Sequence, residues 1–313
     1  MPNNLTLLDL AKLNGADPIV GLIEEVATAS PEVTIIPART IRGTSYKTVI
    51  RNSRPAVGFR AANEGTDATK SNFTERLVEA FILSARIEVD KAVARGHEDG
   101  PEAIQAIEAA GVMRAALSTV GSQTIYGTAA GAKGFFGLQE MVASFGTELV
   151  VDAGGTTAGT GSSVYAIKAG ATGVQYVYGN GTTFDLSAFR EGDATDANGK
   201  RYAAFIADLT AWIGFQCVNK YAVGRLKDAT ADSGKGVTDA QIAALLSKFP
   251  VGERPTHLLM SRRSAFQLQI SRTTAPSTKQ EAFTGILPGV PTESFGIPII
   301  ITDSISDTET LTA

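Results

Sequence analysis

The sequence predicts an α+β fold from which a long two-stranded ribbon protrudes. Two runs with strand character, Thr34–Val57 and Asn72–Val89, flank a polar tip at residues 63–67. Arms of about 15 to 20 residues would extend roughly 50 to 65 Å, whereas a compact chain of this length has a radius of gyration of about 20 Å. A helical pattern about 35 to 40 Å long begins at Pro101, and the 32 glycines favour many turns over a helical bundle.

Composition excludes several classes of protein. The 313 residues favour two domains or one elaborated domain, and the net charge of −4 offers no basic field for tight nucleic-acid binding. The single cysteine, Cys217, excludes an internal disulfide. No apolar run approaches the length of a membrane span, and no secretory signal begins the chain. We therefore expect no membrane contact and synthesis in the cytosol.

Residues 1–32 predict a helical arm. An apolar group at Leu5–Leu10 comes first, and Asp17 then caps a second helix whose Ile19–Val26 segment carries one apolar face. Pro31 ends this helix. The apolar stripe is modest, so we expect the arm to dock on another subunit; its own domain is the alternative.

Residues 33–90 form the predicted ribbon. Apolar and charged side chains alternate along both arms, and Pro37 and Pro55 each remove a ladder donor, which an edge strand tolerates. An isolated ribbon is only marginally stable in water and leaves unpaired edges. We therefore expect copies of the protein to lay this ribbon on one another.

The rest of the chain alternates helices and strands. Ile104, Ile107 and Val120 recur with helical spacing in a long helix over about 101–126. The stretch Arg201–Leu226 predicts paired long strands, although its periodicity also allows some helix. Further helices are expected near 139–144, 238–249 and 261–271, strands at 164–168, 174–178, 256–260 and 295–301, and loops at 153–163 and 273–291.

No residue set predicts catalysis, a cofactor or a metal site, so we expect no enzyme. Glycine runs around Lys133 and Lys235 lack the Ser or Thr that follows the lysine of a phosphate-binding loop. Cys217 lies in an apolar stretch, where a thiol stays protonated. His97 and His257 are far apart in the sequence and have no neighbouring ligands.

Two charged groups leave alternatives open. Glu88 and Asp90 share a strand face and could act as paired carboxylates, but Arg86 on the same face favours a solvated or salt-bridged edge of the ribbon. Arg262–Arg263, followed by Arg272, either contacts phosphate or consists of ordinary helix-surface charges. Neither group is enough to indicate an active site.

Three segments carry a resemblance to a known family: the closing segment Phe295–Ile305, the strand and helix Leu258–Ser264, and the loop Gly134–Leu138. They follow an arm, a ribbon and a long helix, and in this order the chain resembles the major capsid proteins of tailed double-stranded-DNA bacteriophages. The resemblance covers nearly the whole chain. It implies a Hong Kong 97-like capsid fold with an N-arm at 1–32, an E-loop ribbon at 33–90, a P-domain with the spine helix and long strands at 91–230, and an A-domain with the C-terminal strand at 231–313.

The order of segments departs from the familiar pattern of that family. Arg201–Leu226 precedes Thr256–Ile301, whereas the comparable P-domain strands usually follow the A-domain, so a rearranged connectivity is expected. No scaffold-sized segment precedes the arm, so any scaffold is expected to be a separate protein. Some members cross-link through an E-loop lysine, but neither Lys47 nor Lys70 lies in a context that carries this role over.

The resemblance implies a major capsid protein that self-assembles into pentamers and hexamers of an icosahedral head around the genome. Its partners would be other copies, portal, scaffolding and decoration proteins, and double-stranded DNA held weakly and non-specifically. It would reside in the virion capsid after assembly in the bacterial host cytoplasm. The alternatives are an encapsulin-type nanocompartment shell, a soluble oligomeric α/β enzyme, or a phage tail or decoration protein.

The expected contacts between subunits follow from the ribbon. Its apolar and charged side chains would lie against neighbouring copies, where each contact is weak but many contacts together are stable. The residues expected to make these contacts are Ile35, Ile36, Tyr46, Lys47, Arg51, Phe59, Arg60, Glu64, Phe73, Arg76 and Glu79.

Overall fold

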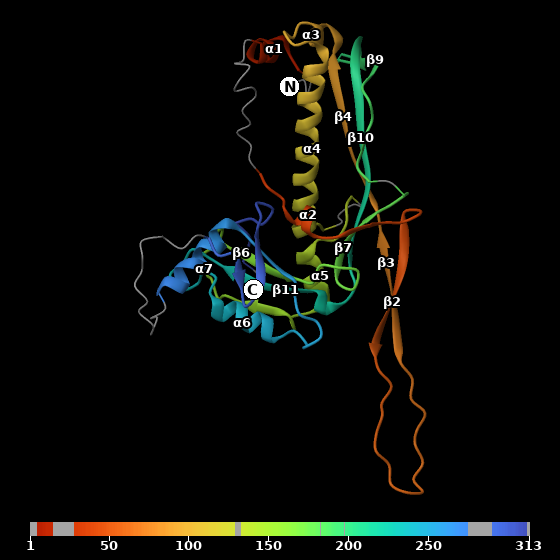
Figure 1. Cartoon of the computed structure of the whole chain (residues 1–313), viewed down its shortest axis with the longest axis vertical. Helices are drawn as coiled ribbons and strands as arrows, with labels where there is room; N and C mark the ends of the chain where they lie inside the picture. Colours follow the sequence, from red (N-terminus) through yellow and green to blue (C-terminus); the bar gives the residue numbers. More distant parts are fainter. Residues whose placement is uncertain are drawn as a thin grey trace.

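A computed structural model describes residues 5–14, 28–128, 133–181, 183–196, 198–274 and 290–311. The molecule has three parts (Figure 1). A long helix lies beside two long strands, a second sheet with two helices packs near one end of that helix, and a ribbon projects past the body. The helix and the ribbon together give the molecule its elongated shape.

The first part is built on α4 (Pro101–Tyr126), β4 (Phe81–Asp90) and β10 (Arg201–Cys217). The two strands are antiparallel and stay in register from one end of β4 to the other. Side chains alternate along β4, so that Ile87 and Val89 are buried in a cluster with residues of α4 while the opposite face stays largely exposed. The apolar period of two therefore fixes which face of the sheet meets the helix.

β10 organises its sheet. It pairs antiparallel with β4, β7, β8 and β9, and β1 adds to β7 in parallel. With 17 residues, β10 spans roughly 55 Å, about the length of the first part. The remaining strands of this sheet are β1 (Ala38–Thr40), β7 (Val174–Tyr178), β8 (Asp185–Leu186) and β9 (Arg190–Thr195).

The helix α1 (Leu7–Leu13) docks on its own subunit, near α3 (Lys91–Arg95). Leu10 is buried in the cluster that also holds residues of α3, α4 and β4. The Asn14 side-chain amide donates to the carbonyl of Gly96 at 3.0 Å. Helix α1 therefore docks on its own subunit, which was the alternative to docking on another subunit. The second predicted helix of the arm lies outside the described residues.

The second sheet has the order β13-β14-β12-β6-β11-β5. Its strands present alternate side chains to two cores: Val164 and Leu258 face α6 (Asp239–Ser247) and α7 (Arg262–Thr274), whereas Tyr165 faces the core shared with α4. The strands are β5 (Val150–Asp152), β6 (Ser162–Ile167), β11 (Val223–Ala229), β12 (His257–Met260), β13 (Glu293–Ser294) and β14 (Ile297–Ile301).

The C-terminal tail is fixed to this sheet by a buried ion pair. Arg225 and Glu309 lie 3.1 Å apart, and both side chains are 7% exposed. Glu309 also accepts hydrogen bonds from the hydroxyls of Tyr126 at 2.6 Å and Ser163 at 2.5 Å. Burial, together with the Glu309 carboxylate, raises the pKa of Tyr126. A charge buried in this way is tolerated because its hydrogen-bond partners are in place.

Residues 29–32, named here the N-terminal joint, lie between the C-terminal tail and α4, which is the spine helix. The Asp303 amide donates to the Ala29 carbonyl at 3.0 Å, and the Asp303 carboxylate accepts from the Ala29 amide at 2.8 Å. Glu32 is fully buried and accepts a hydrogen bond of 2.5 Å from the Ser304 hydroxyl. The cluster lies against Gly121 of α4, where a Cβ would stand only 2.6 Å from the nearer Glu32 oxygen. Because Gly121 has no side chain, the N-terminal joint and the tail can pack directly against α4.

The structure confirms most of the predicted elements. The long helix runs from Pro101 to Tyr126, as its periodicity predicts. The predicted salt bridge on β4 joins Arg86 and Glu88 at 2.6 Å. The three further helices are α5 (Leu138–Phe145), α6 and α7, and the four strands predicted at 164–168, 174–178, 256–260 and 295–301 are β6, β7, β12 and β14.

The predicted strand runs of the ribbon are too long. Residues 32–35 form the short helix α2 (Glu32–Ile35), in which the amides of Ile35 and Ile36 donate to the carbonyls of Pro31 and Glu32 at 3.1 and 3.0 Å. The return arm divides at Ala80, where β3 (Asn72–Glu79) ends and β4 begins. β3 stays with β2 (Ser45–Ser53), whereas β4 gains a buried face by pairing with β10.

The prediction that Arg201–Leu226 forms two strands paired with each other is wrong. A 3-10 turn at Lys220–Ala222, in which the Asn219 side chain accepts a hydrogen bond from the Tyr221 amide, directs β11 into the second sheet while β10 stays in the first. Strands β5, β6 and β11 also precede residue 231, so the second sheet is not confined to residues 231–313. The central strand β6 pairs with β11 on one side and β12 on the other.

We expect Gly121→Ala to destabilise the protein, although alanine favours a helix over glycine by about 1 kcal/mol. The added methyl would overlap Glu32, Ser30 and Ser304 and separate the joint from α4; overpacking of this kind costs about 1 to 3 kcal/mol. Gly111→Ala in the same helix is the control, because nothing lies within 4 Å of its Cβ position. Denaturant unfolding checks the prediction, which is wrong if the two variants are equally stable.

Candidate assembly surface

The ribbon has two different faces. β2 and β3 pair antiparallel from Ser45↔Glu79 to Arg51↔Phe73, and a bulge follows at Ser53↔Asn72. Because cross-strand partners share a face, every second pair points toward the body and the others point away from it. The residues that point away are Ser45, Lys47, Val49, Arg51, Phe73, Glu75, Leu77 and Glu79.

This outward face is apolar as well as charged. Val49, Phe73 and Leu77 are 67%, 55% and 52% exposed. Lys47 pairs with Glu75 across the strands at 3.0 Å. More than half of each of these three apolar side chains is therefore exposed to water, an apolar surface that a partner could cover.

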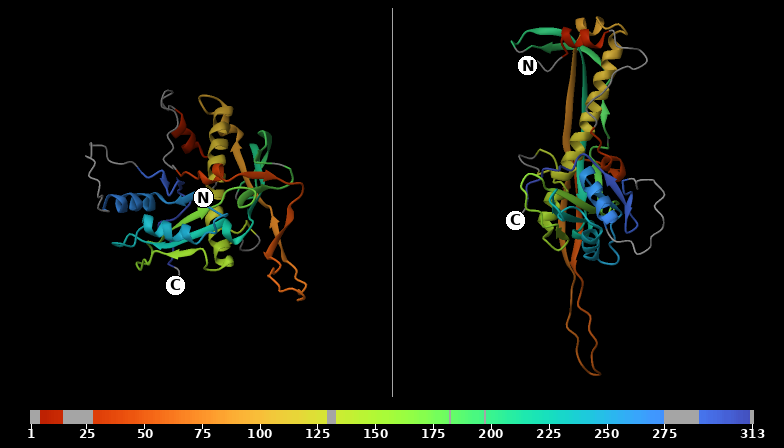
Figure 2. Two further views of the ribbon diagram at one scale, coloured as in Figure 1. Left: turned by 60° about the horizontal axis from the view of Figure 1, so that its bottom comes forward. Right: turned by 90° about the vertical axis from the view of Figure 1, so that its left-hand side faces the viewer.

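The tip of the ribbon, residues 54–71, has no strand pairing. Val57 and Phe59 are fully exposed there, at 96% and 111%. The turn itself is ordered by Glu64, whose carboxylate accepts from the Ala61 amide at 2.9 Å and whose carbonyl accepts from Arg60 at 2.9 Å. The second view of Figure 2 shows the ribbon extending past the body at one end of the molecule. The exposed Phe59 side chain belongs to the tip of this ribbon.

The root of the ribbon is fixed firmly to the first sheet. Arg76 donates to the carbonyl of Cys217 at 2.8 Å, and its guanidinium lies 4.6 Å from the centre of the Phe145 ring. The Tyr46 hydroxyl donates to the buried side chain of Gln216. The ribbon therefore leaves the body in a set direction, while its outer half carries its side chains into solvent.

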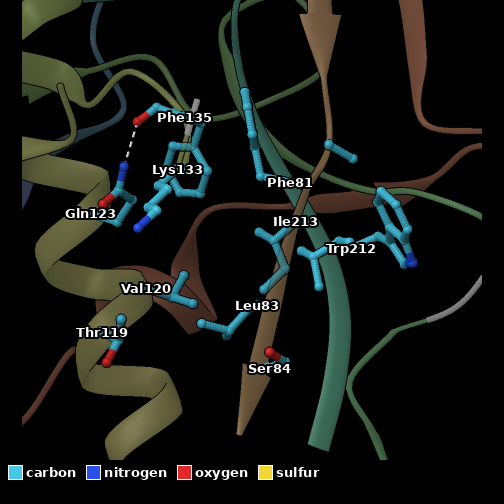
Figure 3. Close-up of a pocket in the computed structure, with 13 residues that line it drawn as sticks. Phe81, Leu83, Ser84, Thr119, Val120, Gln123, Lys133, Phe135, Trp212 and Ile213 are labelled. Atoms are coloured by element: carbon cyan, nitrogen blue, oxygen red, sulfur yellow. Dashed lines mark hydrogen bonds between the residues drawn. The ribbon is translucent and has the colours of Figure 1, made fainter. Parts of the chain in front are cut away.

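Two adjoining cavities lie beside this root, one against the spine helix α4 and the other between β3 and α5. The larger, of about 560 Å³, lies between α4 and the strands β4 and β10, and the smaller measures about 360 Å³. Phe81 and Phe135 line both. In Figure 3, Val120 and Gln123 of α4 approach the strands, while Trp212 extends to the side away from the helix; Gln123 donates to the Phe135 carbonyl at 2.7 Å. Together the cavities form a mostly apolar groove, named here the spine groove.

The residues considered for chemistry do not form a site. Cys217 is buried, and burial raises the pKa of its thiol to about 12. Desolvation lowers the pKa of His257, which keeps this imidazole neutral, and its ring contacts Thr256. Within the described ranges, no three His, Cys, Asp or Glu side chains are grouped to hold a metal ion. Among the described helices, none has both the length and the apolar composition to cross a bilayer.

The basic residues of α7 make structural contacts. Arg263 donates to the carbonyls of Asp307 at 2.9 Å and Thr160 at 2.6 Å. Arg272 forms a two-pronged ion pair with Asp239, at 2.6 and 2.9 Å. These contacts favour the interpretation of this group as ordinary structural charges. Of the three arginines, only Arg262 is exposed and has no hydrogen-bond or ion-pair partner in the part of the chain that the structure describes.

The structure separates the predicted contact residues into two groups. Ile36 is buried in the main core, and Tyr46 and Arg76 bind their own subunit at the ribbon root, so these three are not free for a neighbour. Ile35 is half-buried in α2. The remaining predicted residues are exposed on the outward face or at the tip: Lys47, Arg51, Phe59, Arg60, Glu64, Phe73 and Glu79.

The prediction also missed exposed apolar residues. Val49, Val57 and Leu77 are as accessible as the residues chosen from the sequence. Strand alternation contained part of this signal, because Val49 shares the parity of Lys47 and Arg51, and Leu77 that of Phe73. Without the cross-strand register, however, parity alone could not show which face meets the body.

Comparisons with known proteins identify the family and the fold of the chain. A family model described as Major capsid protein GP7 matches residues 16–313. No curated protein sequence matches the chain. A chain of the near-atomic structure of bacteriophage Epsilon15 is similar in fold, with a TM-score of 0.73 and 17% identity, and the match covers 100% of this chain and 98% of that one. This likeness confirms the predicted α+β shell-protein fold.

Weaker likenesses extend to two other shells. A chain of the capsid of Myoviridae phage XM1 has a TM-score of 0.47 and 10% identity, over 70% of this chain and 97% of that one. A chain of the holo-SrpI encapsulin complex from Synechococcus elongatus has a TM-score of 0.46 and 8% identity, over 71% and 95%. Both scores indicate only a partial likeness.

We expect Arg76→Gln to loosen the ribbon root. The variant loses the charged hydrogen bond to the Cys217 carbonyl and the contact with the Phe145 ring. The free energy of local opening of β2 and β3 should fall by about 1.5 to 3 kcal/mol. Hydrogen exchange of the strand amides measures this change.

Lys47→Gln is the matched control for that experiment. Lys47 lies on the same ribbon, but its ion pair with Glu75 is exposed and should contribute little. Equal exchange protection in the Arg76→Gln and Lys47→Gln variants would show that Arg76 does not hold the root.

Proposed function

The chain belongs to the family of major capsid proteins GP7, and from this premise we propose that its copies join through their ribbons into the pentamers and hexamers of a closed icosahedral head. Family membership makes the protein a shell protein of a bacteriophage, located in the virion capsid, that assembles with copies of itself. The proposal concerns how the copies meet. It also includes assembly in the cytoplasm of the bacterial host.

The exposed ribbon is the observation that carries this proposal. The side chains of Phe59 and Val57 are fully exposed in the single subunit. Val49, Phe73 and Leu77 extend this apolar surface along one face of the ribbon. Burying one such side chain contributes about 1.5 to 3 kcal/mol. A single contact is weak, but repetition around a closed shell makes the whole assembly stable.

The spine groove is the proposed receiving surface on the neighbouring copy. It is lined by apolar side chains of α4, β4 and β10, and an aromatic ring such as that of Phe59 is small compared with about 560 Å³. Lys133 at its edge would suit the acidic residues of the tip, Glu64 and Asp67. Shape and charge therefore support the insertion of one subunit's tip beside the spine helix of the next.

The domain assignment follows the observed sheets. We assign the N-arm to the segment through Glu32 and the E-loop to the ribbon of β2 and β3. The first sheet with α4 corresponds to the P-domain. The second sheet with α6 and α7 corresponds to the A-domain, although its strands come from both sides of residue 231.

Other partners are proposed from the role of a shell. Portal, scaffolding and decoration proteins would contact the assembled head, and double-stranded DNA would be held weakly because the chain is acidic overall, with a net charge of −4. We propose that the protein has no enzymatic activity of its own. The inert environment of Cys217 and the structural contacts of the arginines in α7 support this view.

Electron microscopy of the expressed protein tests the proposed function. Wild-type protein should form closed shells, whereas deletion of Ala61–Lys70 should leave the subunit folded and abolish closure, because β2 and β3 keep their pairing without the tip. Shells containing a protein cargo in place of long DNA would favour an encapsulin. A uniform dimer or tetramer without shells would favour a soluble enzyme, and normal particles from the deletion would contradict the role of the ribbon.

We expect Phe59→Ser to weaken assembly without unfolding the subunit. The Phe59 side chain is fully exposed in the single subunit, so its stability should be unchanged. The loss of about 1.5 to 3 kcal/mol per contact should raise the concentration needed for assembly by about tenfold or more. Sedimentation separates shells from free subunits.

Val251→Ser is the control, because Val251 is equally exposed, at 104%, but lies outside the ribbon. It should assemble like the wild type. If Phe59→Ser and Val251→Ser assemble at the same concentration, the tip does not take part in the contact.

A further inference from the structure

The segment that leads into the ribbon and forms its first arm differs in charge from the return arm. The ribbon strand β2 begins at Ser45, so Arg39 and Arg42 lie in the part that leads into the ribbon. Between residues 38 and 63 the sequence holds six basic residues and no acidic one, whereas residues 64–80 hold two basic and four acidic residues. The first segment is named here the outgoing arm. All six of its basic residues are exposed: Arg39, Arg42, Lys47, Arg51, Arg54 and Arg60.

These cations are largely unpaired. Within the part of the chain that the structure describes, Lys47 alone pairs with a carboxylate, that of Glu75. Arg42 and Arg54 have no ion-pair or hydrogen-bond partner among the described residues. The other three touch only aromatic rings or a backbone carbonyl: Arg39, Arg51 and Arg60.

The rest of the chain carries the opposite charge. The whole sequence has 28 basic and 32 acidic residues, of which residues 38–80 hold eight and four, so that 20 and 28 remain elsewhere. The ribbon segment is therefore +4 and the remainder, named here the acidic body, is −8. The ribbon projects away from the body (Figures 1 and 2), so the cations of its outer half are separated from the acidic body of their own subunit.

We propose that the outgoing arm is a cationic docking strip whose partner is the acidic body of a second copy of this chain. The inference rests on the proposed assembly into a shell. It adds that electrostatic attraction brings two subunits together before their apolar surfaces make contact. Opposite charges on two surfaces raise the rate of association and suppress wrong registers. Because single exposed ion pairs add little affinity, the strip governs how fast and in which register copies meet, while the apolar contacts supply the affinity.

The side chains beside the cations favour a protein partner over a nucleic acid. Val49, Phe59 and Phe73 are exposed between or opposite the arginines, and a phosphate backbone offers charge but no apolar surface to cover them. The return arm also places an acidic residue beside a cation, because Arg60 donates to the carbonyl of Glu64 at 2.9 Å. The Glu64 carboxylate therefore repels phosphate near this arginine within the Debye length of about 8 Å at physiological salt. The body of another copy provides both acidic and apolar side chains.

The test is assembly of the Arg42→Gln, Arg54→Gln double variant, followed by light scattering from about 0.01 M to about 1 M salt, over which the Debye length falls from about 30 Å to about 3 Å. Neither side chain has a partner in its own subunit, so folding should be unchanged. The wild-type rate should fall steeply with salt. The double variant should assemble about tenfold or more slowly at low salt and should depend less on salt.

The control is the Arg201→Gln, Arg262→Gln double variant, which changes the net charge equally at two exposed positions outside the ribbon. It leaves the strip intact and makes the acidic body more acidic, so it should assemble at least as fast as the wild type and keep the dependence on salt. Equal behaviour of the two double variants would overturn the proposal. Normal assembly of the ribbon variant with weakened binding to a short DNA duplex would also overturn it, and would identify nucleic acid as the partner.

The experiment distinguishes failure of this inference from failure of the proposed function. Wild-type shells that form at a rate independent of salt would leave the shell function in place and reject the cationic strip. Wild-type protein that forms no shells would reject the proposed assembly, and sedimentation of its smaller oligomers at the same salt concentrations would still show whether Arg42 and Arg54 drive contact between copies.

Discussion

Strand β10 is the constraint on which the other parts of the molecule depend. One edge carries β4, and the other edge carries β9, β8 and β7 in succession along its length. Only Ala80 separates β3 from β4, so the pairing of β4 with β10 also sets the direction in which the ribbon leaves. Arg76 completes this arrangement by binding the carbonyl of Cys217, the last residue of β10. The position of the ribbon is therefore a consequence of one long backbone ladder.

The ribbon gains little from its own subunit beyond this root. A two-stranded ribbon in water leaves both edges unpaired and one face without contacts. The side chains on that face and at the tip combine apolar bulk with charge, including Phe59 and Phe73 beside Arg51. A capsid protein can carry such a surface because it functions as one copy among many. The same surface on a solitary protein would promote aggregation.

Buried carboxylates hold the two chain ends against the spine helix. Glu309 ties the tail to Arg225 and Tyr126, and Glu32 ties the N-terminal joint to Ser304 beside Gly121. A buried charge contributes little net stability, but breaking its contacts is costly, so such groups specify one arrangement over others. The N-terminal joint and the tail are thus both fixed beside the same helix.

The sequence by itself determined the local elements whose signal is short in range. Pro101 and the apolar period defined the spine helix, and alternation defined most strands, because both patterns depend on neighbouring residues. The tertiary structure alone decided that β4 leaves the ribbon at Ala80 and that β10 and β11 enter different sheets. It also decided that Ile36 and Arg76 bind their own subunit while Val49 faces outward. Strand partners and buried faces depend on contacts between residues far apart in the chain, and a single sequence does not contain their register.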